Sequence, residues 1–351
     1  MQGIREMHRV ARAALAARDR IGRGVEYARR GVLDEALDSL SRAASLPLVL
    51  FGVKDTDQIS PDLVQRLGEL PGYLFHTVDA MAPGGRAVDP NLVNPLTGRM
   101  MTGSSSGGCQ NILLGINDLA LATDGGGSVL APALATGLYS IMAKGLGLKG
   151  RRPRVSTDNI EFVPGIGLIS HSYEICAQAV SHLTGVEAGA ISPPLVVRPR
   201  EPGLAPLLEA VLAALGPVPV VEPPVACDRP GLIAFVQEQF ARSSLVLSFE
   251  GPVDLHGYGD SVLGSWGEGG RAMQGRGGKD LLKVANMVDA TALSIPALEL
   301  ACGVLVLAAP GREAGGAALA LGAKLAAALP RPRLYEEYFG RAGSRPAPGY
   351  I

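Results

Sequence analysis

The stretch TGSSSGGCQNILLGINDLALATDGGGSVLAP, residues 102–132, decides how this sequence folds and where its chemistry lies. Two clusters of glycine and serine, TGSSSGG at 102–108 and TDGGGS at 123–128, flank an apolar segment. Glycines beside a serine let backbone N–H groups turn toward one point without a Cβ in the way, as a developing oxyanion requires. The apolar residues before the second cluster predict a strand, the glycines predict a turn, and the residues after them predict a helix start.

A lysine follows a strand-like run upstream of both clusters. LPLVLFGVKD at 46–55 is rich in leucine and valine and ends in Lys54 and Asp55. This pattern is typical of a buried strand whose C-terminal end presents a polar group. A lysine with its ordinary pKa of about 10.4 is a poor base at neutral pH, but burial can lower that pKa by several units. The sequence therefore places Lys54 at an edge of the core, where burial would favour its neutral form.

This order of lysine, serine cluster and TDxGGS segment resembles the amidase signature family. Members of that family carry a lysine after an apolar strand, a GGSSGG loop and a TDxGGS segment. The dipeptide Asn94–Pro95, the helix-like segment 167–185 and the apolar segment 288–307 are also similar to the family's pattern. The resemblance is strongest at three motifs, which are residues 51–55, 102–108 and 123–132.

The resemblance implies an α/β fold with one mixed central β-sheet sandwiched by helices, in a compact variant. It implies a single amidase-signature-like domain over residues 1–351, with the signature core at about 46–185 and N-terminal helices at 1–45. Helical and strand-like apolar patterns interleave along the chain, which favours the same layered architecture.

Residue by residue, the resemblance implies Ser128 as the nucleophile, Ser105 as a cis-serine that relays a proton, and Lys54 as the final base. The cis peptide bond would precede Ser105, although a non-proline cis bond costs about 2.5 to 4 kcal/mol. Attack on a carboxamide, or on a related acyl bond of a small molecule, would give an acyl-enzyme on Ser128. The implied activity is that of an amidase, with no cofactor and no metal.

The resemblance also assigns supporting residues around these three. Backbone N–H groups of the second cluster would form the oxyanion hole, namely those of Gly125, Gly126, Gly127 and Ser128. Polar side chains beside the catalytic ones would support the site, namely Asp124, Ser104 and Ser106.

Three departures from the family's pattern are visible. Ser104 stands where the family has a glycine, Leu130 where it has an arginine, and MAK at 142–144 where it has KPT. Without the arginine, Asp124 lacks its expected partner. The chain is also short for the family, which predicts a more open pocket or one completed by another subunit. An open pocket could hold a bulky or carrier-bound substrate, and completion by another subunit would require a homodimer.

Other functions are compatible with the same motifs. The acyl group could pass to an amine instead of water, which would make the protein an acyl transferase. A glutaminase-like subunit would pass ammonia to a partner protein. A catalytically inactive homologue would bind its ligand without cleaving it, which the loss of the arginine at Leu130 and of KPT favours.

The motif GSSSG at 103–107 also satisfies G-x-S-x-G, the nucleophile elbow of α/β-hydrolases. Ser105 would then be the nucleophile, and His182 or His256 the base. The GGGS segment has no following GK[ST], so a phosphate-binding P-loop is not predicted. No metal-ligand spacing is present among the five histidines, and the four cysteines form no CxxC pair, so we expect buried free thiols.

Composition narrows the range of partners. The 32 basic and 33 acidic side chains give a net charge of −1, and aromatic residues make up only 5%. The protein has no excess of positive charge that would attract a polyanion or an anionic membrane surface. We therefore expect no nucleic acid and no membrane partner. The arginine- and alanine-rich N-terminus is typical of a surface helix and also compatible with a transit peptide. We expect a cytoplasmic protein with a small-molecule amide substrate.

Local patterns give further structural expectations. The sequence predicts surface helices over 10–44, a helix over 205–215 and a helix closed by Gly185. Residues 79–108 are expected to be mostly loop, 129–143 a helix, and 264–278 one mobile loop. Trp266, in that last segment, is expected either to line a substrate entrance or to pack in the core.

Overall fold

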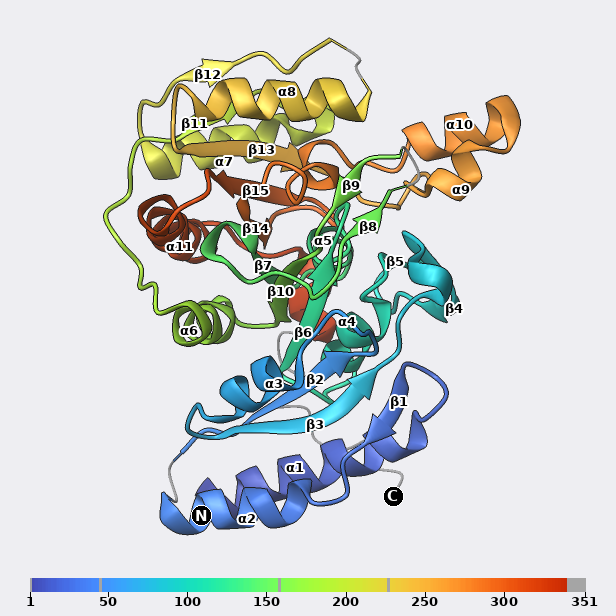
Figure 1. The fold of residues 1–351 in the computed structure, drawn as a ribbon, viewed down its shortest axis with the longest axis vertical. Coiled ribbons are helices and arrows are strands. Elements are labelled where there is room, and N and C mark those ends of the chain that lie inside the picture. Colours follow the sequence, from blue (N-terminus) through green and yellow to red (C-terminus); the bar gives the residue numbers. More distant parts are fainter. Residues whose placement is uncertain (1, 44–45, 157–158, 226–227, 340–351) are drawn as a thin grey trace.

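The computed structural model describes residues 2–43, 46–156, 159–225 and 228–339. Eleven strands form one mixed sheet in the order β1-β3-β2-β6-β10-β7-β14-β15-β13-β11-β12 (Figure 1). Their bounds are β1 Val25–Ala28, β2 Val49–Lys54, β3 Tyr73–Asp79, β6 Leu119–Asp124, β7 Tyr139–Ala143, β10 Gly165–Ser170, β11 Leu195–Val197, β12 Val220–Val221, β13 Leu245–Glu250, β14 Thr291–Pro296 and β15 Gly303–Ala308. Two separate hairpins are formed by β4 Val88–Val93 with β5 Met100–Thr102 and by β8 Arg154–Val155 with β9 Glu161–Phe162.

Twelve α-helices and four short 3₁₀ turns lie in the remaining described chain. The α-helices are α1 Gln2–Asp19, α2 Val32–Arg42, α3 Pro61–Gly68, α4 Ser106–Leu113, α5 Leu130–Ala135, α6 Tyr173–Thr184, α7 Ala205–Leu215, α8 Arg229–Phe240, α9 Ser261–Gly264, α10 Gly267–Gly275, α11 Arg312–Ala328 and α12 Arg333–Tyr338. Short 3₁₀ turns are η1 Pro83–Gly85, η2 Lys144–Leu146, η3 Pro202–Leu204 and η4 Leu281–Lys283.

Helices cover both faces of the sheet (Figure 1). On one face, α3, α6, α7 and α11 contribute apolar side chains to the largest buried cluster. On the other face, α5 and α8 pack on the strands from β7 to β13. The helices α1 and α2 cover Leu50 of β2 and Leu74 of β3. This arrangement confirms an α/β fold with one mixed central sheet between helices.

The pairing of β2 with β6 is the part of the sheet that positions polar groups. The two strands run parallel, with Phe51 opposite Leu119 and Val53 opposite Leu121. Both strands are buried along their whole length. Parallel neighbours end at the same edge of a sheet, so Lys54 at the end of β2 comes close to Asp124 at the end of β6.

The helix expected over 129–143 is wrong in its second half. The helix α5 ends at Ala135, and residues from Tyr139 onward form the buried strand β7. The turn between them passes through Gly137, whose φ of 66° is one that residues other than glycine rarely adopt. Apolar residues alone do not distinguish a buried helix from a buried strand, which explains the error.

Two segments expected to be loops contain regular structure. Within 79–108, β4 and β5 form a hairpin, whose turn is held by a hydrogen bond from Leu96 N–H to Asn94 Oδ1 of 2.9 Å. Within 264–278, the glycine-rich residues form helix α10, which packs against α9. Glycine at position 270 allows this close packing, because a Cβ there would collide with the carbonyl oxygen of Leu263.

At the N-terminus, the expected helices are present but strand β1 separates α1 from α2. The helix over 205–215 is confirmed as α7, and Gly185 closes α6 with a φ of 66°.

The thiols of Cys109, Cys176 and Cys302 are free and buried, whereas Cys227 lies outside the described residues. Within the described ranges, no helix combines the length and apolar character needed to cross a membrane.

Gly52 gives a test of how tightly β2 is packed. A Cβ at Gly52 would collide with Asp79 Oδ2 and Asn117 Nδ2, two atoms of a buried polar cluster. We expect Gly52→Ala to lower the free energy of unfolding by about 2 kcal/mol or more, since overpacking costs about 1 to 3 kcal/mol. Urea unfolding followed by circular dichroism measures it.

The matched control is Gly68→Ala at the end of α3, where a Cβ meets no atom within 4 Å. That change should leave stability within about 1 kcal/mol of the unmodified protein. Equal effects of the two substitutions would contradict the packing seen around β2.

Candidate active site

The amine of Lys54 is the centre of the candidate site. The residue is only 4% exposed, and its Nζ donates to Ser104 Oγ at 2.6 Å and to Ser105 Oγ at 3.3 Å. A third, longer contact of 3.4 Å reaches the carbonyl oxygen of Thr123. Burial lowers the pKa of Lys54 to about 7, an effect that the nearby Asp124 carboxylate opposes. As the sequence predicts, Lys54 is buried and a large fraction of its amine is neutral near pH 7.

The three serines of the first cluster follow β5, with Ser106 as the first residue of α4, and they have different partners. Ser104 and Ser105 both face the Lys54 amine, whereas the hydroxyl of Ser106 donates to Asp89 Oδ2 at 2.6 Å. Ser106 is thus tied to the β4–β5 hairpin rather than to the lysine. Gly107 follows where the chain passes so close to the carbonyl oxygen of Ala80 that a Cβ would collide with it.

The expected cis bond before Ser105 is absent. Among the described residues, the one cis peptide bond is Gly251–Pro252, so the bond between Ser104 and Ser105 is trans. Serine at position 104, where the family has glycine, also supplies a second hydroxyl to the lysine. The Ser104 contact is the shorter of the two.

Asp124 supports the second cluster by binding backbone N–H groups. Its Oδ1 accepts from Gly127 at 2.7 Å, and its Oδ2 accepts from Val129 at 2.6 Å and from Leu130 at 3.3 Å. Burial raises the pKa of this carboxyl, and the three backbone donors oppose that rise. The side chain of Leu130 is fully buried. Asp124 therefore has backbone partners in place of the missing arginine.

The same contacts decide which glycine amides are free. The N–H of Gly127 points at Asp124, which corrects the expectation that it contributes to the oxyanion hole. In the described part of the chain, the N–H groups of Gly125, Gly126 and Ser128 have no acceptor. Three free N–H groups in one short loop are able to bind an anion.

Two side chains hold this loop from opposite segments. A Cβ on Gly125 would lie 2.5 Å from the Phe162 ring of β9, and one on Gly127 would lie 2.5 Å from Leu282 Cδ1 of η4. Gly126, between them, is exposed. The loop is therefore packed on both sides and open at its middle residue.

Ser128 lies at the end of this loop, just before α5, and is partly exposed. Its hydroxyl forms no hydrogen bond with Ser105, Lys54 or any other described residue. The structure thus joins Lys54 to Ser105 directly and leaves the Ser128 hydroxyl unengaged. Catalytic hydrogen bonds are often longer in unliganded sites than in complexes with substrate.

The histidine-dependent alternative finds no support in the structure. His182 is exposed and bonds the carbonyl oxygen of Arg66 at 2.8 Å, and His256 is exposed in the segment after β13. No hydrogen bond links either histidine to Ser105. The described residues contain no group of three or more His, Cys, Asp or Glu side chains placed to hold a metal ion. Trp266 is 71% exposed, so its expected alternative role in core packing is wrong.

Sequence reasoning missed Asp89, Phe162 and Leu282, which hold the serine cluster and the glycine loop in place. No local signal distinguishes them, since each contacts the site only through the fold. Glu250 was also missed, although it does have a local signal in the sequence. It ends an apolar strand, as Lys54 does, and its carboxylate accepts the N–H groups of Asp280, Leu281 and Leu282.

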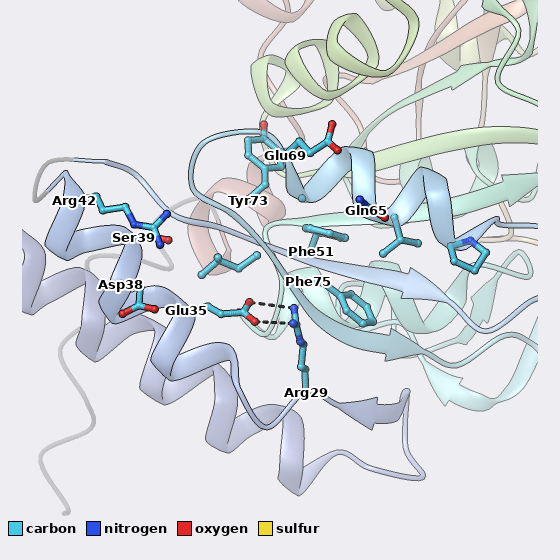
Figure 2. A pocket seen from close by; sticks show the side chains of 14 residues that line it. Arg29, Glu35, Asp38, Ser39, Arg42, Phe51, Gln65, Glu69, Tyr73 and Phe75 are labelled. Carbon is cyan, nitrogen blue, oxygen red and sulfur yellow. Dashed lines mark hydrogen bonds and ion pairs between the residues drawn. The ribbon is translucent and has the colours of Figure 1, made fainter.

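A separate groove of about 700 Å³ lies between α2, α3 and the strands β2 and β3 (Figure 2). The rings of Phe51 and Phe75 lie 5.8 Å apart along it, and an ion pair of 2.6 Å joins Arg29 to Glu35. Lys54, Ser105 and Ser128 do not line this groove. It is a feature apart from the candidate active site.

Comparison with known proteins gives the same fold. No family profile and no curated protein matches the sequence. Among solved structures, a bacterial aryl acylamidase of the amidase signature family is similar at a TM-score of 0.63 and 16% identity, covering 96% of this chain and 95% of that one. A 6-aminohexanoate cyclic dimer hydrolase in complex with its substrate is similar at a TM-score of 0.64 and 16% identity, covering 93% and 95%.

A third structure, described as a vestigial protein complex that reveals the origins of an s-triazine catabolic enzyme, is similar at a TM-score of 0.66. Identity is 18%, and the alignment covers 93% of this chain and 96% of that one. The chain therefore has the amidase signature fold, as the resemblance implies.

Asp124 provides a test of how the glycine loop is held. Asp124→Ala would leave three buried N–H groups without an acceptor, and each such group costs about 1 to 3 kcal/mol. We expect the free energy of unfolding, measured in urea, to fall by about 3 kcal/mol or more. Asp124→Asn keeps one carbonyl acceptor, so it should lower the free energy of unfolding by less than Asp124→Ala does. Equal stability of all three proteins would show that the carboxylate does not organise this loop.

Proposed function

We propose that this protein hydrolyses a carboxamide, or a related acyl bond, of a small molecule through an acyl-enzyme on Ser128. The observation that supports this most is the Lys54 amine, which is buried, has a lowered pKa and contacts two serine hydroxyls. A structural lysine rarely keeps such an environment, whereas a proton acceptor requires it. An aryl acylamidase and a cyclic dimer hydrolase with the same fold support an amide as the substrate class.

The proposed first step moves one proton from Ser128 to Lys54. Ser128 Oγ attacks the carbonyl carbon and gives its proton to the Ser105 hydroxyl, which passes its own proton to the neutral amine of Lys54. The lysine proton then passes back to the Ser105 hydroxyl, which gives its own proton to the leaving nitrogen as the C–N bond breaks. Water, activated in the same way, hydrolyses the ester on Ser128. Ser104 is a second candidate for the relay because its contact with Lys54 is shorter.

The negative charge on the carbonyl oxygen would be stabilised by the free N–H groups of the glycine loop. Gly125, Gly126 and Ser128 supply these donors, while Gly127 holds the loop through Asp124. Preorganised donors of this kind contribute about 100- to 1,000-fold each to the rate. The three free buried thiols also suit a reducing compartment, so we propose that the enzyme works in the cytoplasm.

Covalent labelling of the nucleophile tests the proposal. A fluorophosphonate should add one adduct to the full-length protein by intact mass, and Ser128→Ala should abolish it. Peptide mapping should place the adduct on Ser128. An adduct on Ser105 would instead favour the nucleophile-elbow mechanism, and no adduct at all would favour a binding protein without catalysis.

Two serine variants are matched controls for this labelling. Ser106→Ala removes a hydroxyl that is bonded to Asp89, away from Lys54, and should keep the adduct at Ser128. Ser105→Ala and Ser104→Ala should each slow labelling, and the larger effect identifies the relay residue. A relay through Ser105 alone predicts at least a tenfold difference between these two variants.

The pKa of Lys54 predicts the pH dependence of amide hydrolysis. Lys54 accepts a proton only in its neutral form, which predominates above its pKa of about 7. The value of kcat/KM should therefore rise with pH through about 7 and reach about a tenth of its plateau at pH 6. Lys54→Met should lower the plateau value of kcat/KM, measured at pH 8.5, by about 100- to 10,000-fold and should remove the rise with pH. A profile that is flat between pH 5.5 and 8.5 would contradict Lys54 as the base.

A further inference from the structure

A second cavity, of about 760 Å³, lies in the N-terminal layer between α1, strand β1 and the start of α2. Its volume is in the range typical of small-molecule sites. Large apolar side chains line its walls, namely Leu15, Ile21, Tyr27, Val32 and Leu33. No residue of the candidate active site lines it. The cavity is therefore separate from the proposed chemistry at Ser128.

His76 is a fully buried polar residue of this lining, and its neighbours fix the position of its ring proton. The Nδ1 atom lies 3.0 Å from the carbonyl oxygen of Ile116 and 3.0 Å from Oδ1 of Asn117. The Asn117 amide is oriented by its Nδ2, which donates to Thr77 Oγ1 at 2.7 Å and to Asp79 Oδ1 at 3.2 Å. Both neighbours of Nδ1 are thus acceptors, so Nδ1 carries the proton and Nε2 carries a lone pair.

The Nε2 atom is left without a hydrogen-bond partner among the described residues, although it is buried. Burial also lowers the pKa of His76, which keeps the ring neutral and Nε2 an acceptor. In the sheet order β1-β3-β2-β6, Asn117 precedes β6 on one side of β3, and β1 flanks β3 on the other side. The two nitrogens of an imidazole point in nearly opposite directions. The ring therefore directs Nε2 toward β1 and the cavity.

We propose that this cavity binds a small apolar molecule that carries one hydrogen-bond donor, in the simplest case a phenol, whose hydroxyl donates to His76 Nε2. A buried acceptor without a partner costs free energy, and such a hydroxyl recovers that cost. The apolar walls gain from contact with the ring of the ligand. An ether or a carboxylate has no proton to donate and would leave Nε2 unpaired.

The walls allow a ligand to reach the buried histidine. Leu15 and Leu33 are 63% and 37% exposed, and exposed side chains of this kind change rotamer within nanoseconds. The charged lining residues Arg18, Glu26 and Arg30 are also exposed. Their charges are therefore solvated, and His76 supplies the polar group at the buried end of the cavity.

Titration of the full-length protein with two matched probes tests the proposal. 4-Ethylphenol and 4-ethylanisole have the same ring and the same ethyl group, but only the phenol has a proton to donate. In protein labelled with nitrogen-15 at histidine, the His76 signals are those missing from His76→Asn. The unliganded protein should show the proton on Nδ1. 4-Ethylphenol should shift the Nε2 signal and bind about tenfold more tightly than 4-ethylanisole.

His76→Asn is the matched variant, because asparagine places an N–H donor near the position of Nδ1 and has no atom in place of Nε2. It should bind the two probes with equal affinity. Ala11→Phe fills the cavity from α1 and should weaken the binding of both probes by about tenfold or more. The control Arg12→Phe adds the same side chain at an exposed position of α1 outside the cavity and should leave both affinities unchanged. Circular dichroism checks that each variant is folded.

Several outcomes would overturn the proposal. Equal affinities of the two probes for the unmodified protein, or a proton on Nε2 in the unliganded protein, would refute the assigned hydrogen bond. Absence of binding, or binding that Ala11→Phe leaves as strong as before, would refute the cavity as the site. None of these measurements requires amide hydrolysis, so their result is independent of the labelling at Ser128.

Discussion

The rest of the candidate site depends on one buried amine. Placing Lys54 in the interior removes it from water, and this loss of hydration lowers its pKa to about 7. The cost is offset by two serine hydroxyls and a carbonyl oxygen, which accept hydrogen bonds from the amine, and by the nearby carboxylate of Asp124. An isolated buried ammonium would be far more costly. The polar groups around Lys54 are therefore those that a buried lysine needs.

The mixed sheet makes that environment possible. Because β2 and β6 are parallel neighbours, two chain segments about 70 residues apart in sequence end side by side, which brings Lys54 near Asp124. A slip of one residue in this pairing would turn every side chain of β2 to the opposite face. Gly52 opposes such a slip, because a residue with a Cβ in its place would collide with Asp79 and Asn117. Packing of the core thus fixes the position of a polar group at its edge.

Much of this could be predicted from the sequence, because the motifs are local. The strand ending in Lys54, the strand before Asp124 and the glycine turn each lie within about ten residues, and the structure contains all three. The trans bond before Ser105 and the orientation of the Gly127 amide could not be predicted, since the sequence motif does not specify the backbone conformation of the serine cluster or which amides Asp124 accepts. The strand β7 could not be predicted for another reason. A run of apolar residues shows no alternation of polar and apolar positions that would distinguish a strand from a helix.

The packing of the glycine loop limits how a molecule can reach it. Phe162 covers Gly125, Leu282 covers Gly127, and Gly126 between them is exposed. A substrate of the proposed hydrolysis would reach the loop at Gly126, and the departing amine and the incoming water would share that approach. In that reaction the amine would have to diffuse away before water could take its place. The order of events in each turnover would then follow from two apolar side chains that take no part in bond making.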